Sequence, residues 1–154
     1  VAALLVFDAK ITFQGEAAID LENLCCRDDQ SFYQYNIFLE DGIYIIDCKP
    51  LIKSVVIEVI DGIDKELIAR RFHNTIIKFT IELCEILRKE YNLSSVVLSG
   101  GVFQNEILLI NIYKELIKRD FKVYIHEQIP ANDEGISIGQ MIIGNEILKK
   151  ELVF

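Results

Sequence analysis

The most informative segment is Val96-Val97-Leu98-Ser99-Gly100-Gly101-Val102-Phe103-Gln104-Asn105, in which an apolar strand meets an amphipathic helix through a double-glycine turn. Glycine adopts positive φ without strain and lets a ligand come close to the backbone. The unpaired N–H groups and the positive dipole end of a helix start attract anions. The pattern therefore predicts a phosphate site on the amides of Gly100 and Gly101. A tight turn without a ligand is the alternative.

The second half of the chain alternates strands with helices. Hydrophobic spacing predicts strands at 95–99 and 122–125, helices at 105–119 and 134–150, and a turn at 130–135. This order is typical of parallel strands in an α/β layer, whose ligands bind beyond the carboxyl ends of the strands. We therefore expect the glycine turn and the 130–135 turn to lie on the same edge.

The first half is richer in helix. Apolar spacing predicts helices at 16–26 and 64–90, and two strands at 33–39 and 43–47 read as a hairpin closed by an acidic, glycine-containing turn. The segment 50–60 begins with a proline, which suits the first turn of a helix. Its many β-branched residues leave a strand open as the alternative.

Composition narrows the function. The 154 residues fit one compact domain or one lobe of a larger one, and the net charge of −8 opposes binding to nucleic acid or to an anionic membrane surface. Apolar runs are shorter than the roughly 20 residues of a membrane span, and no leader is recognisable, so we expect a cytoplasmic protein. The apolar start at Val1, without an initiator methionine, predicts a piece of a longer chain.

The four cysteines (Cys25, Cys26, Cys48 and Cys84) lack the spacing of a zinc or redox site, and we expect reduced thiols.

Four segments, taken together, resemble the C-terminal part of the hydrogenase-maturation carbamoyltransferases of the HypF type. They are Ile-Thr-Phe-Gln-Gly-Glu-Ala-Ala-Ile-Asp-Leu-Glu at 11–22, Ile-Ala-Arg-Arg-Phe-His at 68–73, Ser-Gly-Gly-Val-Phe-Gln-Asn at 99–105 and Pro-Ala-Asn-Asp-Glu-Gly-Ile-Ser-Ile-Gly-Gln at 130–140. The segments occur in the family's order and span nearly the whole chain. Four motifs in order are more specific than a lone glycine pair.

The resemblance implies an α/β fold: the second lobe of an actin-like ATPase (ribonuclease H-like) fold, with a mixed sheet flanked by helices, related to the tRNA threonylcarbamoyl transferases. Residues 1–154 would form this single lobe of a longer carbamoyltransferase and would be inactive alone. The family makes a carbamoyl-adenylate from carbamoyl phosphate and ATP. It passes the carbamoyl group to the C-terminal cysteine of a partner protein in nickel–iron hydrogenase maturation.

By the same resemblance, Gly15, Gly100, Gly101 and Asn105 would contact the nucleotide. Two of these residues have simpler explanations that stay open: Asn105 would serve as the N-cap of its helix, and Gly15 with Glu16 would only begin another helix. No residue is singled out as the general base.

Asp133 is the candidate metal ligand, because the wider fold family joins an Asp of this motif to two histidines of a His-x-x-x-His helix. That pair is absent, since His73 and His126 are far apart in sequence. We therefore expect the divalent metal of the parent enzyme not to be retained by this fragment. An N-cap role for Asp133 is the alternative. Glu134 stands where the family usually has glycine, and His73 is expected to be a structural histidine.

Two functional classes remain. One is an enzyme lobe for carbamoyl transfer to a protein thiol, with transfer to the oxygen of a small molecule as a variant. The other is a noncatalytic module that binds nucleotide or a partner. In either case we expect exposed apolar surface to make the fragment self-associate.

Overall fold

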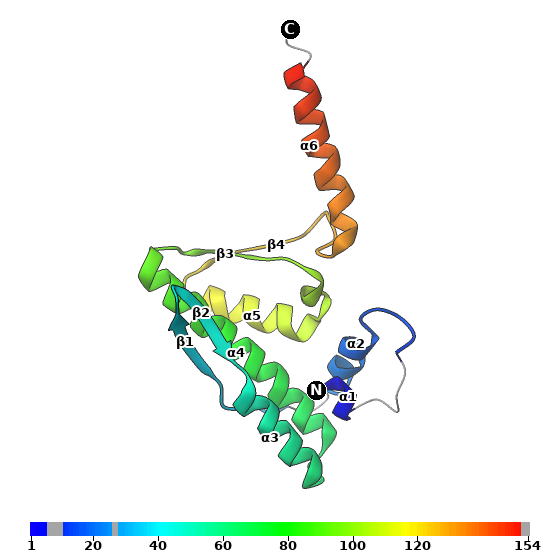
Figure 1. Cartoon of the computed structure of the whole chain (residues 1–154), viewed down its shortest axis with the longest axis vertical. Helices are drawn as coiled ribbons and strands as arrows, with labels where there is room; N and C mark the ends of the chain where they lie inside the picture. Colours follow the sequence, from blue (N-terminus) through cyan, green and yellow to red (C-terminus); the bar gives the residue numbers. More distant parts are fainter. Residues whose placement is uncertain (6–10, 26–27, 152–154) are drawn as a thin grey trace.

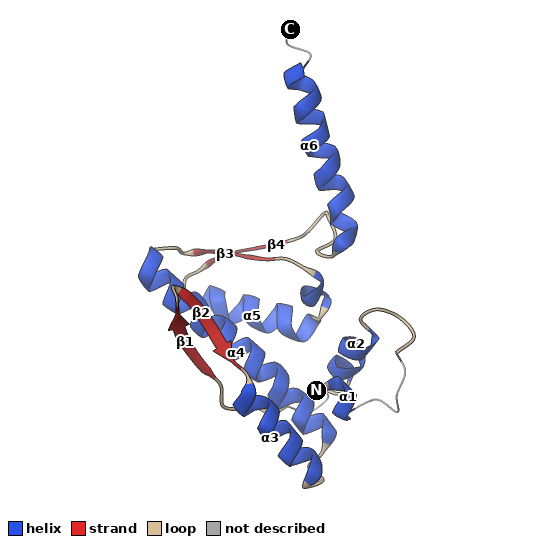
Figure 2. Cartoon of the chain, in the orientation of Figure 1, coloured by secondary structure: helices blue, strands red, loops and turns tan. Residues whose placement is uncertain are grey.

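The computed structural model describes residues 1–5, 11–25 and 28–151, with side chains up to Lys149. It confirms an α/β fold with small sheets among helices (Figure 2). In chain order the elements are α1 (Ala2–Leu5), α2 (Glu16–Asn23), β1 (Asn36–Glu40), β2 (Ile43–Asp47), α3 (Lys49–Ile60), α4 (Lys65–Tyr91), β3 (Ser95–Leu98), η1 (Gly101–Gln104), α5 (Glu106–Lys118), β4 (Lys122–Ile125), η2 (Asp133–Gly135) and α6 (Ile136–Glu151).

Strands β3 and β4 pair in parallel, as the alternation of strand and helix predicts. Their register runs from Ser95 opposite Lys122 to Leu98 opposite Ile125, and α5 makes the crossover between them. The pair runs alongside α5 in Figure 1. Because the two strands point the same way, the glycine turn and the 130–135 turn both follow their carboxyl ends on one edge, as expected.

Strands β1 and β2 form the predicted hairpin, which begins at Asn36 rather than at residue 33. In the described part of the chain, the antiparallel pair and the parallel pair form two separate two-stranded sheets. The single mixed sheet that was expected is therefore not found among these residues. The hairpin lies beside α4 in Figure 1. The Tyr44 hydroxyl donates to Glu90 Oε2 of α4 at 2.5 Å, which fixes one end of it there.

Much of the described structure packs around the long helix α4. Asp64 caps it by accepting from the Glu66 N–H at 3.0 Å, and Asn92 ends it in the left-handed conformation. The segment that could have been a strand is the helix α3, packed against α4. One buried cluster lies between α4 and the elements before it, and the second between α4, α5 and the parallel strands.

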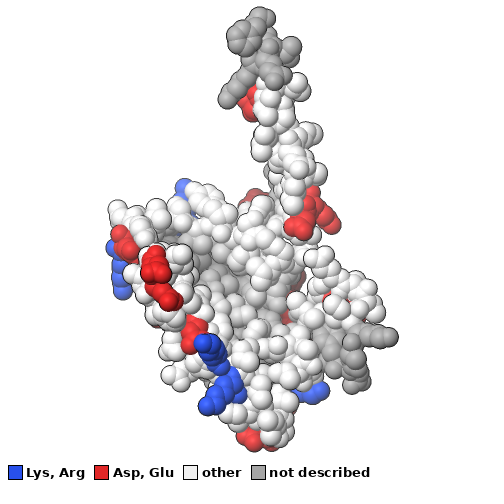
Figure 3. All heavy atoms as spheres, viewed as in Figure 1, with Lys and Arg blue, Asp and Glu red and all other residues white. Residues whose placement is uncertain are grey.

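Helix α6 extends away from the body (Figure 1), and most of its visible surface in Figure 3 carries no charged side chain. Met141 is 68% exposed, and Ile143 is 63% exposed. No helix in the described part of the chain combines the length and the apolar character needed to cross a bilayer.

Candidate functional site

The turn after β3 is more elaborate than a strand running directly into a helix. Gly100 has φ 101° and ψ 158°, a conformation essentially restricted to glycine. A 3-10 turn, η1, then separates Gly101 from α5. The Gly100 N–H donates to the Ala131 carbonyl at 2.9 Å, which ties the glycine turn to the turn after β4. The Gly100 N–H is therefore already used within the protein, and its expected role as a phosphate donor stays a prediction.

The next two amides along the turn are different. The N–H groups of Gly101 and Val102 make no hydrogen bond to any residue that the structure describes. A Cβ on Gly101 would meet its neighbours only at ordinary contact distances, 3.9 Å to Gln104 Oε1 and 4.0 Å to Asn132 Cβ. The backbone thus does not need glycine here, and the missing side chain leaves the two amides accessible.

The first turn of α5 is closed to a phosphate. Glu22, from α2, accepts the N–H of Glu106 at 2.7 Å and of Ile107 at 3.3 Å. Asn105 caps the helix, with Oδ1 accepting the Leu108 N–H at 2.9 Å. These two side chains take the donors that an anion would use. The predicted N-cap role of Asn105 is confirmed, and the predicted phosphate site at the start of the main helix is not.

A cavity of about 390 Å³ opens where α2, α4 and η1 meet, and it brings together three of the four predicted nucleotide residues: Gly15, Gly101 and Asn105. Glu22 and His73 also line it. Its remaining lining residues are mostly apolar: Ala18, Ile19, Leu21, Phe72, Ile76, Val102 and Leu108, together with Gln14 and Gln104. Segments nearly ninety residues apart in sequence thus form a single pocket.

Gly15 enters this cavity from the start of α2. It has φ 93° in the left-handed region, where a side chain would be strained. Glu16 Oε2 accepts from the Thr12 amide, from the Thr12 hydroxyl at 3.0 Å and from the Phe13 amide at 3.4 Å. The hydrogen bond from the Thr12 N–H is the main reason that the pKa of Glu16 lies below its ordinary value. The carboxylate therefore holds the loop before Gly15 in place.

His73, expected to be structural, is only 2% exposed and fully hydrogen-bonded. Its Nδ1 lies 2.9 Å from the Ala69 carbonyl and 3.1 Å from Cys25 Sγ. Its Nε2 lies 3.0 Å from Asn105 Nδ2. Burial lowers the pKa of His73, so the neutral ring is favoured. The sequence gives no sign of the contact with Asn105, because the two residues are 32 positions apart.

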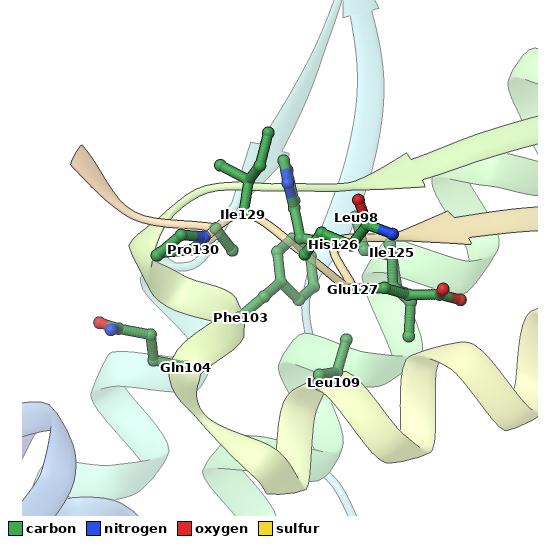
Figure 4. A pocket seen from close by; sticks show the side chains of 11 residues that line it. Leu98, Phe103, Gln104, Leu109, Ile125, His126, Glu127, Ile129 and Pro130 are labelled. Atoms are coloured by element: carbon green, nitrogen blue, oxygen red, sulfur yellow. The ribbon is translucent and has the colours of Figure 1, made fainter. Parts of the chain in front are cut away.

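A second group of polar side chains lies at the strand ends. Ser99 Oγ and His126 Nε2 are 2.8 Å apart, one following β3 and the other β4. His126 borders a cavity of about 460 Å³, shown in Figure 4, with Phe103 of η1 and Leu109 of α5 beneath the strand ends. Neither Ser99 nor His126 was predicted as a site residue. Their positions at the ends of paired parallel strands are the signal that could have suggested them.

Asp133 does not line the first cavity, although a Cβ on Gly101 would lie 4.0 Å from Cβ of its neighbour Asn132. It is exposed and borders a separate cavity of about 400 Å³ with Ser99 and His126. The alternative N-cap role is wrong, because Asn132 caps the turn by accepting the Glu134 N–H at 3.2 Å and α6 begins only at Ile136. Within the described ranges, no three His, Cys, Asp or Glu side chains lie close enough to hold a metal ion. The donors present do not fit the metal of the wider fold family.

Comparison with known proteins assigns the family. Residues 1–140 match a domain family described as carbamoyltransferase, Kae1-like domain, second subdomain. The chain belongs to the HypF carbamoyltransferase family. The carbamoyltransferase HypF of Synechocystis sp. is 30% identical over 143 residues, which are 92% of this chain and 18% of that protein. The chain therefore spans under a fifth of the length of this curated relative.

Two solved HypF structures have the same fold. A crystal structure of full-length HypF in the phosphate- and nucleotide-bound form superposes with a TM-score of 0.87, at 39% identity, over 96% of this chain and 19% of that chain. The structure of T. kodakarensis HypF gives a TM-score of 0.75 at 23% identity, over 97% of this chain and 19% of that chain, and supports the fold alone. The predicted HypF-type resemblance and α/β fold are confirmed.

Proposed function

We propose that this chain is the nucleotide-binding C-terminal lobe of a carbamoyltransferase that acts in nickel–iron hydrogenase maturation. In the longer parent enzyme, which uses ATP and carbamoyl phosphate, the lobe holds a carbamoyl-adenylate while the carbamoyl group passes to the C-terminal cysteine of a partner protein. Residues 1–154 act as one lobe of that enzyme and are inactive alone. We propose that the reaction takes place in the cytoplasm, where thiols such as Cys48 and Cys84 stay reduced.

The observation that carries the proposal is the cavity shared by Gly15, Gly101 and Asn105. Its apolar walls suit the adenine ring, and the unused amides of Gly101 and Val102 supply donors for phosphate oxygens. The nucleotide-bound HypF structure, at 39% identity, adds support from a relative. Glu22 and Asn105 already occupy the α5 amides, so the phosphate is assigned to η1 instead.

The transfer itself places clear demands on such a site. The partner thiolate attacks the carbamoyl carbon, a C–S bond forms, and the C–O bond to AMP breaks with the electron pair leaving on the phosphate. Negative charge thus grows on the phosphate oxygens, and preorganised amides stabilise charge as it develops. The Gly101 and Val102 N–H groups would serve this role. The general base is not assigned, and no step is routed through a metal, which would need ligands beyond Asp133.

Calorimetric titration of ATP and AMP into the chain tests the proposal. We expect weak binding by the wild type, its loss in Gly101→Val, and a clear reduction in Gly101→Ala. The alanine variant is informative because its Cβ fits the folded structure without a close contact. Gly144→Ala is the matched control, since that glycine lies in α6 with open space around it.

Unchanged affinity in both Gly101 variants would remove the phosphate role of the turn. A change in the Gly144 control equal to that in Gly101→Ala would show that the effect does not come from the pocket. Circular dichroism of every variant separates loss of the site from loss of the fold.

A further inference from the structure

His73 stands behind the cavity and contacts the residue that faces it. It projects from α4, and its ring bridges the chain just after α2, through Cys25, and the start of α5, through Asn105. Both the imidazole and the Asn105 amide line the cavity. The buried ring is thus hydrogen-bonded to a side chain that lines the cavity.

The hydrogen bonds fix the tautomer of His73. A backbone carbonyl only accepts, so the nitrogen 2.9 Å from the Ala69 oxygen, Nδ1, must carry the proton. Asn105 Oδ1 accepts from the Leu108 N–H, so its Nδ2 is the atom that faces Nε2 of His73. Nδ2 donates to the unprotonated Nε2. The second Nδ2 proton has no partner among the residues described, and it remains for a ligand in the cavity.

A proton added to His73 would disrupt this arrangement. Nε2 would become a donor and would face the donor Nδ2 of Asn105. If the amide turned over to offer Oδ1 to the ring, Nδ2 would instead face the Leu108 N–H, and α5 would lose its cap. Both outcomes alter the side chain that faces the cavity.

The charged neighbours of His73 are few. From α2, Glu22 raises the pKa of the imidazole, and on α4 itself Arg70 lowers it. The Cys25 thiol adds a polar contact on the α2 side, and at the start of α5 the uncharged Asn105 amide is hydrogen-bonded to the ring. Burial lowers the pKa of His73 by more than the Ala69 hydrogen bond and the Glu22 carboxylate raise it, which leaves the neutral ring as the resting form.

We propose that His73 is a positioning residue: its neutral, Nδ1-protonated ring holds the Asn105 amide so that it both caps α5 and presents an N–H to the bound nucleotide, and protonation of His73 releases it. The ligand half of this inference rests on the nucleotide site proposed above. The hydrogen-bond half stands on the protein alone and is tested separately.

Nuclear magnetic resonance of the chain with ¹⁵N-labelled histidine and backbone tests the hydrogen-bond half without a ligand. We expect the His73 ring to be neutral and protonated on Nδ1 near pH 7. As the pH falls, the protection factor of the Leu108 amide, which is its exchange rate compared with the intrinsic rate at the same pH, should drop together with the titration of His73. A ring protonated on Nε2 near neutral pH, or a Leu108 amide that ignores the titration, overturns the inference.

His73→Gln is the matched variant, because glutamine offers an acceptor to Asn105 and does not titrate. In it the Leu108 exchange should follow only the ordinary pH dependence of exchange. His73→Phe, which lacks any acceptor, should show a fast-exchanging Leu108 amide at every pH. If His73→Phe fails to fold, the comparison of wild type with His73→Gln still decides the outcome.

Adenosine is the probe for the ligand half, since it lacks a phosphate that would titrate or respond to His126. We expect the wild-type dissociation constant to rise by up to about tenfold per pH unit below the pKa of His73, and to stay flat in His73→Gln. A parallel pH dependence in both proteins overturns the positioning role. Absence of adenosine binding at any pH, with the Leu108 response intact, would instead count against the nucleotide site.

Discussion

The cavity at Gly15, Gly101 and Asn105 and the edge at Asp133 lie on either side of the same glycine turn, yet they are built differently. The first is closed by contacts between distant segments, including the Glu22 carboxylate on α5 and the Asn105 amide on His73. The second is bordered by exposed residues and by α6, whose main contact with the rest of the described chain is η2. The chain thus completes one site with its own residues and leaves the other open.

The largest effect is expected from the core that supports the closed site. Leu116 is fully buried under the parallel strands, and Leu116→Ala should cost about 2–5 kcal/mol of unfolding free energy, from lost burial and the cavity left behind. Ile117→Ala, on the exposed side of the same helix, should cost much less. Urea denaturation followed by circular dichroism gives both values. Equal losses would contradict the assignment of this core.

Substitutions at the two glycines of the turn should affect stability and nucleotide binding separately. Gly100→Ala places a side chain at φ 101° and should cost roughly 1–3 kcal/mol of stability. Gly101→Ala should change stability by no more than about 0.5 kcal/mol while weakening nucleotide binding. Thermal unfolding and AMP titration of both variants provide the test. Loss of stability in the Gly101 variant would mean that this glycine serves the backbone after all.

Glu22 links α2 to α5, and its substitution should have an intermediate effect on the free energy of unfolding. Glu22→Ala removes the acceptor for two helix-start amides and should cost about 1 kcal/mol. Glu22→Gln keeps one oxygen acceptor and should recover part of that loss. Chemical denaturation of the two variants measures the difference. If glutamine is no better than alanine, the negative charge rather than the hydrogen bonds accounts for the effect.

A smaller effect should appear in the pH dependence of stability. The pKa of His73 is lowered in the folded protein, so below about pH 6.5 the unfolded chain takes up a proton that the native state resists. The stability of the wild type should therefore fall as the pH drops through this window, by more than in His73→Gln. Denaturant midpoints at pH 8 and pH 5.5 give the comparison.

The open side should affect association rather than stability. Ile143→Lys and Ile147→Lys lie on exposed parts of α6 and should leave the unfolding free energy nearly unchanged. We expect the wild-type chain to self-associate through its exposed apolar surface, and these variants to weaken that association by tenfold or more. Sedimentation equilibrium measures both. A wild-type chain that stays monomeric at high concentration would contradict the expectation.

Local patterns were enough to predict most elements. Apolar spacing predicted α4, the hairpin and the alternation that leads to the parallel strands, and Asn105 was recognised as a possible N-cap. What sequence reasoning missed depends on tertiary contacts. Glu22 fills the start of α5 from 84 residues away, and no local signal shows that the helix dipole is already satisfied by another segment. The choice between Asn132 and Asp133 as a cap likewise depends on where the chain bends after β4.

Helix α4 connects the two hydrophobic clusters of the molecule. Its 27 residues extend about 40 Å, and they contribute Ile68 and Ala69 to one hydrophobic cluster and Ile81 to the other. The candidate cavity touches the helix at His73, between these two ends. Because both clusters share this continuous helix, neither should unfold alone, and the lobe should unfold in a single cooperative step. Ligand binding near the middle of the helix should therefore stabilise the whole lobe against unfolding.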